Sequence, residues 1–413
     1  MTTGLAIAAL AIIYCMRLSS EIRANLALLI SAVVFGVFSI QTIAIIFLQN
    51  NSDKIVPPQT IFKKVMELRD QGSEAYPTVF PWVFIRGNET VSVEGRNILP
   101  LSGIGGKRTV YCNETGRFLV YTADEYGFLN PQSAWQNQDI DVLLVGDSFA
   151  QGACVPPEDN IAAQLRRKVS TISIGMGGNG PLLMLAGLRE FLSKTQAKTI
   201  MWLYFEGNDL YELEHEKKNS RLQLYLNKSS FRQNNWKHQK ALNNFLINYA
   251  EKKISAQKKL IELKSFHERP SQRFIGFLML RPLRNLIGLR ASHTPQEAEN
   301  VDRKPFNIGN ADFSTFTRVL KRARDDVHGQ GAKFIFIYLP DHLTRGSKPA
   351  QIHAYKKIVK IVERLKIPLL DMRAAFSVRN DLPLLFSCEN CHYSSHGYAV
   401  VARAIEKFVS AIN

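Results

Sequence analysis

The chain has 413 residues, 46% of them hydrophobic, and a formal net charge of +16. This length and apolar content allow one large domain or two modest ones with a true core, and they exclude a disordered protein. The charge is uneven, because residues 216–304 hold 19 Lys and Arg but 7 Asp and Glu, a net charge of +12. Since no nucleic-acid recognition motif accompanies this region, we expect an anionic lipid surface or an acidic polymer as its partner, and no nucleic acid.

Two apolar runs near the N-terminus predict a membrane anchor over residues 1–48. Leu26–Leu48 would form a helix about 34 Å long, enough to cross a hydrocarbon core of about 30 Å. Leu5–Met16 is shorter, and a short first helix, an interfacial segment and part of a weak signal sequence all remain open for it. Because positive charges favour the cytoplasmic side of a membrane, Arg17 and Arg23 predict a cytoplasmic loop between the runs. The main domain would then lie on the periplasmic or extracytoplasmic side. Three lysines beyond the second run oppose this orientation (Lys54, Lys63 and Lys64).

Residues 49–138 predict a connector followed by a small subdomain. Residues 49–78 are mostly polar and contain one helical piece, "TIFKKVMELRDQG". From Val79 to Pro131, short runs rich in Val, Tyr, Phe and Thr alternate with Gly and Pro, which is typical of short strands joined by turns.

From residue 139 to 413, strand-like and helical segments alternate, which predicts an α/β fold with a parallel sheet covered by helices on both faces. Expected strands are Ile140–Val145, Thr171–Ile174, Thr199–Phe205, Phe334–Leu339 and Pro368–Leu370, and expected helices are Asn160–Val169, Leu182–Leu192, Phe316–Val327, Ile352–Leu365 and Tyr398–Ile412. A basic, helix-prone insertion, residues 211–306, interrupts the alternation. Within it, Phe274–Ala291 mixes large apolar residues with arginines, so it either lies on a membrane surface or packs on the domain with its arginines in solvent.

Four short motifs follow the order of the expected strands: "GDSF" with Ser148, "GMGGNGP" with Gly178, "EGND" with Asn208 and "CENCHYSSHGY" with His392. Together they resemble the SGNH, or GDSL, hydrolase superfamily, over roughly residues 140–413 apart from the insertion. The resemblance implies a flavodoxin-like sheet and serine-dependent chemistry on ester bonds, without a cofactor or a metal.

Ser148 is the expected nucleophile and His392 the general base, because a serine hydroxyl attacks only when a base takes its proton. The backbone amides of Ser148 and Gly178 and the side-chain amide of Asn208 would form the oxyanion hole. The family usually places an aspartate three residues before the histidine. Here that position is Glu389, which is one methylene longer, so either Glu389 or a backbone carbonyl orients the ring.

Cysteine usage leaves the redox state open. Cys15 lies in the membrane segment, and the four remaining cysteines form either two disulfides or four thiols (Cys112, Cys154, Cys388 and Cys391). A Cys112–Cys154 bond would join the strand-rich subdomain to the region six residues beyond Ser148. A single "CENC" pair is poor support for a zinc site.

Other polar residues near the expected sheet edge have lesser roles. Asp341 and His342 follow the fourth strand and are candidates for substrate contact. Asp147 and Asp209 are expected to brace their loops, and His396 to stand at the start of the last helix rather than to bind metal.

The sequence therefore predicts a membrane-anchored serine esterase or O-acyltransferase that acts on acyl groups, chiefly acetyl groups, of an envelope or exported polysaccharide. Expected partners are the acylated carbohydrate, membrane lipid and a multi-span membrane acyltransferase or another membrane complex. The alternative is a non-catalytic glycan-binding or scaffold subunit with the same fold.

Overall fold

The computed structural model describes residues 18–50, 59–268, 277–278, 280, 308–341, 349–388 and 391–412, except for residues 88, 94, 137 and 138. The chain divides into two compact units. One comprises Met1–Ile55 and Lys259–Asp302, and the other comprises Val56–Lys258 and Arg303–Asn413.

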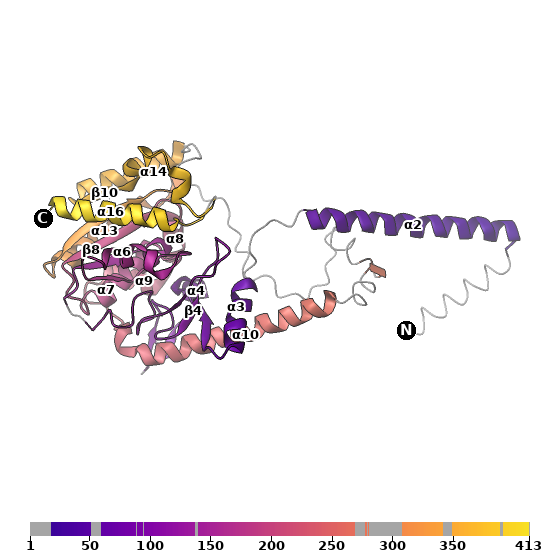
Figure 1. The fold of residues 1–413 in the computed structure, drawn as a ribbon, viewed down its shortest axis with the longest axis horizontal. Helices are drawn as coiled ribbons and strands as arrows, with labels where there is room; N and C mark the ends of the chain where they lie inside the picture. Colours follow the sequence, from indigo (N-terminus) through magenta and orange to yellow (C-terminus); the bar gives the residue numbers. More distant parts are fainter. Residues whose placement is uncertain are drawn as a thin grey trace. The chain divides into compact units, whose positions relative to one another are not determined.

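The first unit contains α2 (Ser20–Asn50), the long indigo helix in Figure 1. Among the described residues it is the one helix long and apolar enough to cross a membrane, with a candidate span over Ser20–Ile43 of mean hydropathy 2.2. An anchor and a signal sequence both meet this test. The helix begins six residues before the predicted Leu26, and Glu21 in its first turn interacts favourably with the helix dipole. Leu5–Met16 lies outside the described residues.

The second unit contains a five-stranded parallel sheet of order β10-β9-β8-β6-β7. Its strands are β6 (Val142–Val145), β7 (Thr171–Ser173), β8 (Thr199–Phe205), β9 (Lys333–Leu339) and β10 (Leu369–Asp371). Numbered along the chain, this order is 2-1-3-4-5, that of flavodoxin-like folds. The predicted fold class is confirmed, and each strand begins and ends within two residues of its expected bounds.

Helices cover both faces of this sheet (Figure 1). In β6, Leu143 and Val145 belong to one buried cluster and Val142 and Leu144 to another, because successive side chains of a strand point to opposite faces. The first cluster includes residues of α7 (Pro181–Phe191), α13 (Phe313–His328) and α14 (Pro349–Arg364), and the second includes residues of α6 (Ile161–Leu165), α15 (Met372–Ser377) and α16 (Ser395–Ile412). The sheet is therefore buried on both sides.

The strand-rich subdomain forms as expected but shares its core with the sheet. It contains α3 (Gln59–Asp70), α4 (Pro81–Gly87), the three-stranded sheet β1-β4-β5 (Ala75–Pro77, Arg108–Val110 and Val120–Thr122) and the hairpin of β2 (Val91–Val93) and β3 (Arg96–Ile98). Phe84, Val110 and Phe128 of this region lie in the same buried cluster as Leu143 of β6. The subdomain is thus fixed against the α/β core, which allows it to contribute side chains to a common site.

Most of the described part of the insertion is helical. It contains most of α8 (Asp209–Glu216), α9 (Ser220–Asn227) and α10 (Gln239–Glu268). Leu213, Leu222 and Tyr225 of α8 and α9 are fully buried, so these two helices belong to the core. Of Phe274–Ala291, only Phe277, Leu278 and Leu280 are described, so the membrane-surface reading of that segment stays a prediction.

Candidate active site

Ser148 lies where strand β6, between β8 and β7 in the sheet, meets a short helix. After Val145 the chain turns through Gly146 and Asp147, and Ser148 begins α5 (Ser148–Gln151). The Asp147 carboxylate accepts a hydrogen bond from the backbone N–H of Phe149 at 2.9 Å and so caps the helix. This places the Ser148 side chain at the carboxyl edge of the sheet, where parallel α/β folds bind their ligands.

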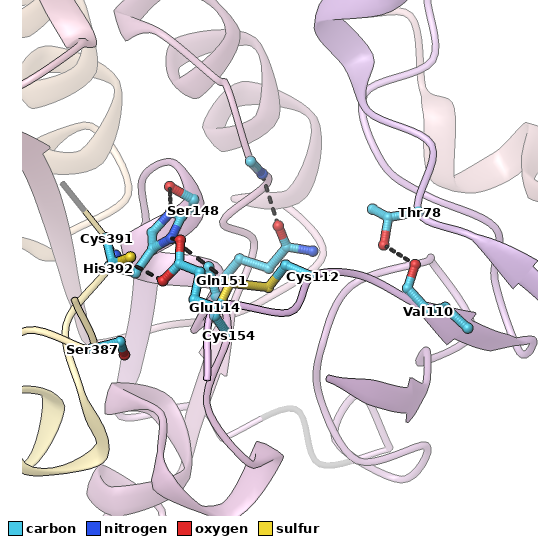
Figure 2. Close-up of a disulfide and its surroundings, with 12 residues drawn as sticks. Thr78, Val110, Cys112, Glu114, Ser148, Gln151, Cys154, Ser387, Cys391 and His392 are labelled. Atoms are coloured by element: carbon cyan, nitrogen blue, oxygen red, sulfur yellow. Dashed lines mark hydrogen bonds and ion pairs between the residues drawn. A yellow bond between two sulfur atoms is a disulfide. The ribbon is translucent and has the colours of Figure 1, made fainter. Parts of the chain in front are cut away.

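The His392 ring lies between the hydroxyl of Ser148 and a carboxylate of the strand-rich subdomain (Figure 2). His392 Nε2 is 2.9 Å from Ser148 Oγ, and His392 Nδ1 is 2.7 Å from Glu114 Oε1. The other oxygen, Glu114 Oε2, accepts the backbone N–H of His392 at 2.9 Å. A carboxylate at Nδ1 requires the proton to sit there, which leaves Nε2 free to accept the proton of the serine.

Glu114 is the residue that the sequence analysis missed. Glu389, predicted for this role, lies outside the described residues, and the structure brings Glu114 to Nδ1 of His392 instead. Glu114 stands in the loop between β4 and β5, some 280 residues from His392 in the chain, so no spacing rule connects them. The available signal is Cys112, two residues earlier, because a Cys112–Cys154 bond would bring this loop beside the serine.

That disulfide is present in the structure. Cys112 and Cys154 are bonded, with their Cα atoms 5.4 Å apart (Figure 2). The loop that carries Glu114 is closed at its base, where Leu119 N donates to Cys112 O at 2.8 Å. The disulfide and this backbone bond together hold Glu114 against the loop that follows Ser148. A second disulfide joins Cys388 to Cys391, directly before His392.

The glycine loop after β7 packs tightly against α5. Gly177 N donates to Gln151 Oε1 at 2.8 Å, which ties the loop to the helix that begins at Ser148. Gly178 has φ +74°, and a Cβ there would lie 2.4 Å from Cδ1 of Trp82. Only glycine fits both constraints. The subdomain thus approaches the site on two sides, through Glu114 and through Trp82.

Asn208 follows β8 and faces the loop of Ser148. Its side chain lies near Asp147, the neighbour of Ser148, and lowers the pKa of that carboxyl. Burial raises the pKa of the Asp147 carboxyl to about 6, opposed by the N–H of Phe149, the nearby His392 and the Asn208 amide. Asp209 is also buried and accepts the backbone N–H of Phe205 at 3.1 Å. Both aspartates therefore brace their loops, as predicted.

A polar cluster lies at the same edge of the sheet, after β8 and β9. Glu206 Oε2 accepts hydrogen bonds from the hydroxyl of Tyr338 at 2.7 Å and from Arg373 at 2.9 Å. Burial is the main cause that raises the pKa of the Glu206 carboxyl, and the charge of Asp341 adds to it. The hydrogen bond from Tyr338 and the charge of Arg373 oppose this shift. Asp341, a predicted substrate contact, thus stands beside this cluster, whereas His342 lies outside the described residues.

One group of side chains could hold a metal ion among the residues that the structure describes. Ligand atoms of Glu114, Cys154 and His392 all lie within 4.8 Å of one another. In the disulfide, Cys154 offers no thiolate, and the other two groups bond each other, so this state of the site favours proton transfer over metal binding. His396 bonds Asp381 at 2.7 Å near the start of α16, in line with the expected helix-start role.

The four motifs thus meet at one edge of a sheet of order 2-1-3-4-5. This strand order is that of flavodoxin-like folds, and the arrangement of the motifs at its edge resembles that of SGNH hydrolases. No protein-family model matches the chain, and no curated protein matches it.

Several solved structures are similar to the chain. A lipase/acylhydrolase from Enterococcus faecalis is 14% identical, with 66% of this chain and 96% of that one covered at a TM-score of 0.36. A putative lipolytic protein of the G-D-S-L family from Desulfitobacterium hafniense is 12% identical, with 66% and 99% covered at 0.35. A psychrotrophic esterase from a Pseudoalteromonas species is 8% identical, with 67% and 98% covered at 0.33.

Proposed function

We propose that the chain is a serine esterase or O-acyltransferase in which Ser148, His392 and Glu114 form the catalytic triad. The observation that carries this proposal is the continuous hydrogen-bonded chain from Ser148 Oγ through both ring nitrogens of His392 to Glu114 Oε1, with steps of 2.9 and 2.7 Å. Glu114 replaces the predicted Glu389 in this proposal.

In the first half of the reaction, His392 Nε2 takes the proton of Ser148 as Oγ attacks the carbonyl carbon of the ester. Glu114 accepts the Nδ1–H and stabilises the imidazolium that forms. The negative charge on the former carbonyl oxygen is met by the backbone amides of Ser148 and Gly178 and by the Asn208 amide. His392 then returns the proton to the leaving alkoxide, and the acyl group remains on Ser148.

In the second half, a hydroxyl attacks the acyl-serine while Nε2 takes its proton. Water as the attacking group gives hydrolysis, and a sugar hydroxyl gives acyl transfer. The same side chains serve both reactions, so the acceptor that reaches the site decides between them.

We further propose that the substrate is an acylated, chiefly acetylated, envelope or exported polysaccharide, reached from the extracytoplasmic side of a membrane. Two features support this placement. Helix α2 is long and apolar enough for an anchor, and the second unit carries two disulfides, which persist in oxidising compartments. The partners proposed with it are membrane lipid beside the basic insertion and a multi-span membrane acyltransferase that delivers the acyl group.

The alternative is a non-catalytic glycan-binding or scaffold subunit, which a sequence without the family's aspartate before His392 favours. The Glu114 carboxylate, 2.7 Å from Nδ1 of His392, supports the catalytic proposal over this alternative.

The test is release of acetate from p-nitrophenyl acetate and from acetylated polysaccharides by the purified full chain, with a second assay for acetyl transfer to a sugar hydroxyl. We expect the Ser148→Ala variant to lose more than about 10³-fold of either activity. Ser387→Ala is the matched control, since this serine lies in the loop of His392 and its hydroxyl makes only a 3.5 Å contact with Tyr393 O. Full activity in a folded Ser148→Ala protein would exclude the proposed nucleophile.

A further inference from the structure

The sulfur of Cys154 lies near Nδ1 of His392, the ring nitrogen that also contacts Glu114. Cys154 Sγ is 3.8 Å from His392 Nδ1, and Glu114 Oε1 is 2.7 Å from the same atom. Cys154 is 5% exposed, and the side chains of Glu114 and His392 are 20% and 25% exposed. A disulfide sulfur, an imidazole nitrogen and a carboxylate oxygen therefore converge at the rim of the site, on the opposite side of the ring from Ser148.

We propose that reduction of the Cys112–Cys154 disulfide turns this rim into a zinc site made of Cys154, His392 and Glu114. A dithiol reductant gives two electrons and two protons to the disulfide, which becomes two thiols, and the reductant leaves as its own disulfide. The Cys154 thiol loses its proton to solvent as it binds Zn²⁺. Water fills the fourth position, as at other three-ligand zinc sites.

The spacing of the ligand atoms suits a tetrahedral ion. With Zn–S of about 2.3 Å and Zn–N and Zn–O of about 2.0–2.1 Å, tetrahedral angles require about 3.6 Å between sulfur and nitrogen and about 3.3 Å between nitrogen and oxygen. The structure has 3.8 and 2.7 Å for these two separations. The sulfur–nitrogen separation would shorten by about 0.2 Å and the nitrogen–oxygen separation would widen by about 0.6 Å, which rotation of the partly exposed Glu114 side chain can supply.

Zinc at this position would stop the chemistry proposed above, and this consequence rests on the proposed function. A metal bound to Nδ1 displaces the proton from that atom, so a neutral ring must carry its proton on Nε2. Nε2 then donates to Ser148 Oγ and cannot take its proton. The site would be active when oxidised and would be blocked by zinc when reduced.

Two single variants separate this proposal from a simple loss of the disulfide. Cys112→Ser and Cys154→Ser lose the same crosslink and are therefore matched in its contribution to stability. They differ in the thiol that remains. Cys112→Ser leaves the Cys154 thiol beside His392, whereas Cys154→Ser leaves the Cys112 thiol. Neither variant needs a reductant, so the Cys388–Cys391 disulfide stays intact.

The experiment titrates the full chain, in detergent and without reductant, with Zn²⁺ by calorimetry and with Co²⁺ by absorption spectroscopy. We expect Cys112→Ser to bind one ion at least tenfold more tightly than Cys154→Ser and to show the charge-transfer band of a cobalt–thiolate bond. Adding Glu114→Gln to Cys112→Ser should weaken binding about tenfold or more. Circular dichroism verifies that each variant is folded, and equal metal binding by folded Cys112→Ser and Cys154→Ser would overturn the proposal.

Labelling by a fluorophosphonate then tests the consequence for the serine. In Cys112→Ser, Zn²⁺ should slow labelling at least tenfold and a chelator should restore it, while Cys154→Ser should be unaffected. If neither variant labels at all but Cys112→Ser binds the metal, the zinc site stands and the proposed enzymatic function fails.

Discussion

The Glu114→Gln substitution tests which carboxylate orients His392. The sequence pattern predicts Glu389 for this role, whereas the structure places Glu114 at Nδ1 of the ring. The wild-type carboxylate accepts two hydrogen bonds from His392, at Nδ1 (2.7 Å) and at the backbone N–H (2.9 Å). Glutamine keeps the size but has one acceptor oxygen. Either its NH₂ group faces the backbone N–H of His392, or it faces Nδ1 and forces the ring into the wrong tautomer. Both arrangements also remove the charge that stabilises the imidazolium.

The expected loss follows from this geometry. Replacing the charged third member of a serine triad by its amide costs about 10⁴ in turnover where the pair is well buried. Here the two side chains are 20% and 25% exposed, so water offsets part of the lost charge, and we expect a fall of about 10²–10⁴ in kcat, about 3–5 kcal/mol. The assay is p-nitrophenyl acetate hydrolysis over pH 5–9. Glu389→Gln is the control and should stay within about threefold of wild type. An inactive Glu389→Gln beside an active Glu114→Gln would refute the reasoning.

Three further predictions follow from the packing and charge of the site. Gly178→Ala should lower activity by about tenfold or more, because its Cβ would meet Trp82 at 2.4 Å. Gly106 has a similar φ of +68° and nothing within 4 Å of its Cβ position, so Gly106→Ala should leave activity unchanged. Equal activity of the two variants would contradict this prediction. Burial raises the pKa of Glu216 to about 8. The folded chain therefore keeps this proton where the unfolded chain loses it, so urea titrations should show the free energy of unfolding fall by up to about 1.4 kcal/mol per pH unit between pH 5 and 8 from this group. Glu216→Gln should remove this contribution to the pH dependence of the free energy of unfolding. An unchanged pH dependence would show that another group causes it. The Cys112→Ser/Cys154→Ser double variant removes a crosslink of sequence separation 42. It should lower the free energy of unfolding by about 4 kcal/mol. A loss below about 1 kcal/mol would show that the disulfide contributes little to stability.

The α/β part of the fold was predictable because its strands are short apolar runs that end in small or polar residues. Ser148, Asn208 and His392 each follow a strand or precede a helix, so the sequence alone places them at the common edge of a parallel sheet. Residues 199–205 form β8 with the predicted bounds, since both faces of the strand are buried and the run is continuous.

Glu114 could not be found in this way. It belongs to the strand-rich subdomain, and its approach to His392 depends on tertiary packing between that subdomain and the α/β core, which leaves no periodic trace in the sequence. The close contact of Trp82 with Gly178 has the same origin. Residues 160–169 show a smaller difference, because the helical period continues to Val169 while α6 ends at Leu165, where the chain tightens before β7.

Peptide mapping of the full chain after reaction with a fluorophosphonate tests the proposed reactivity of Ser148 most directly. A hydroxyl activated by His392 and Glu114 should carry the phosphonyl group on Ser148 alone, and the rate of labelling should fall at least 10²-fold in both His392→Ala and Glu114→Gln. An unlabelled Ser148 in folded wild-type protein, or labelling at an unchanged rate in His392→Ala, would contradict the account.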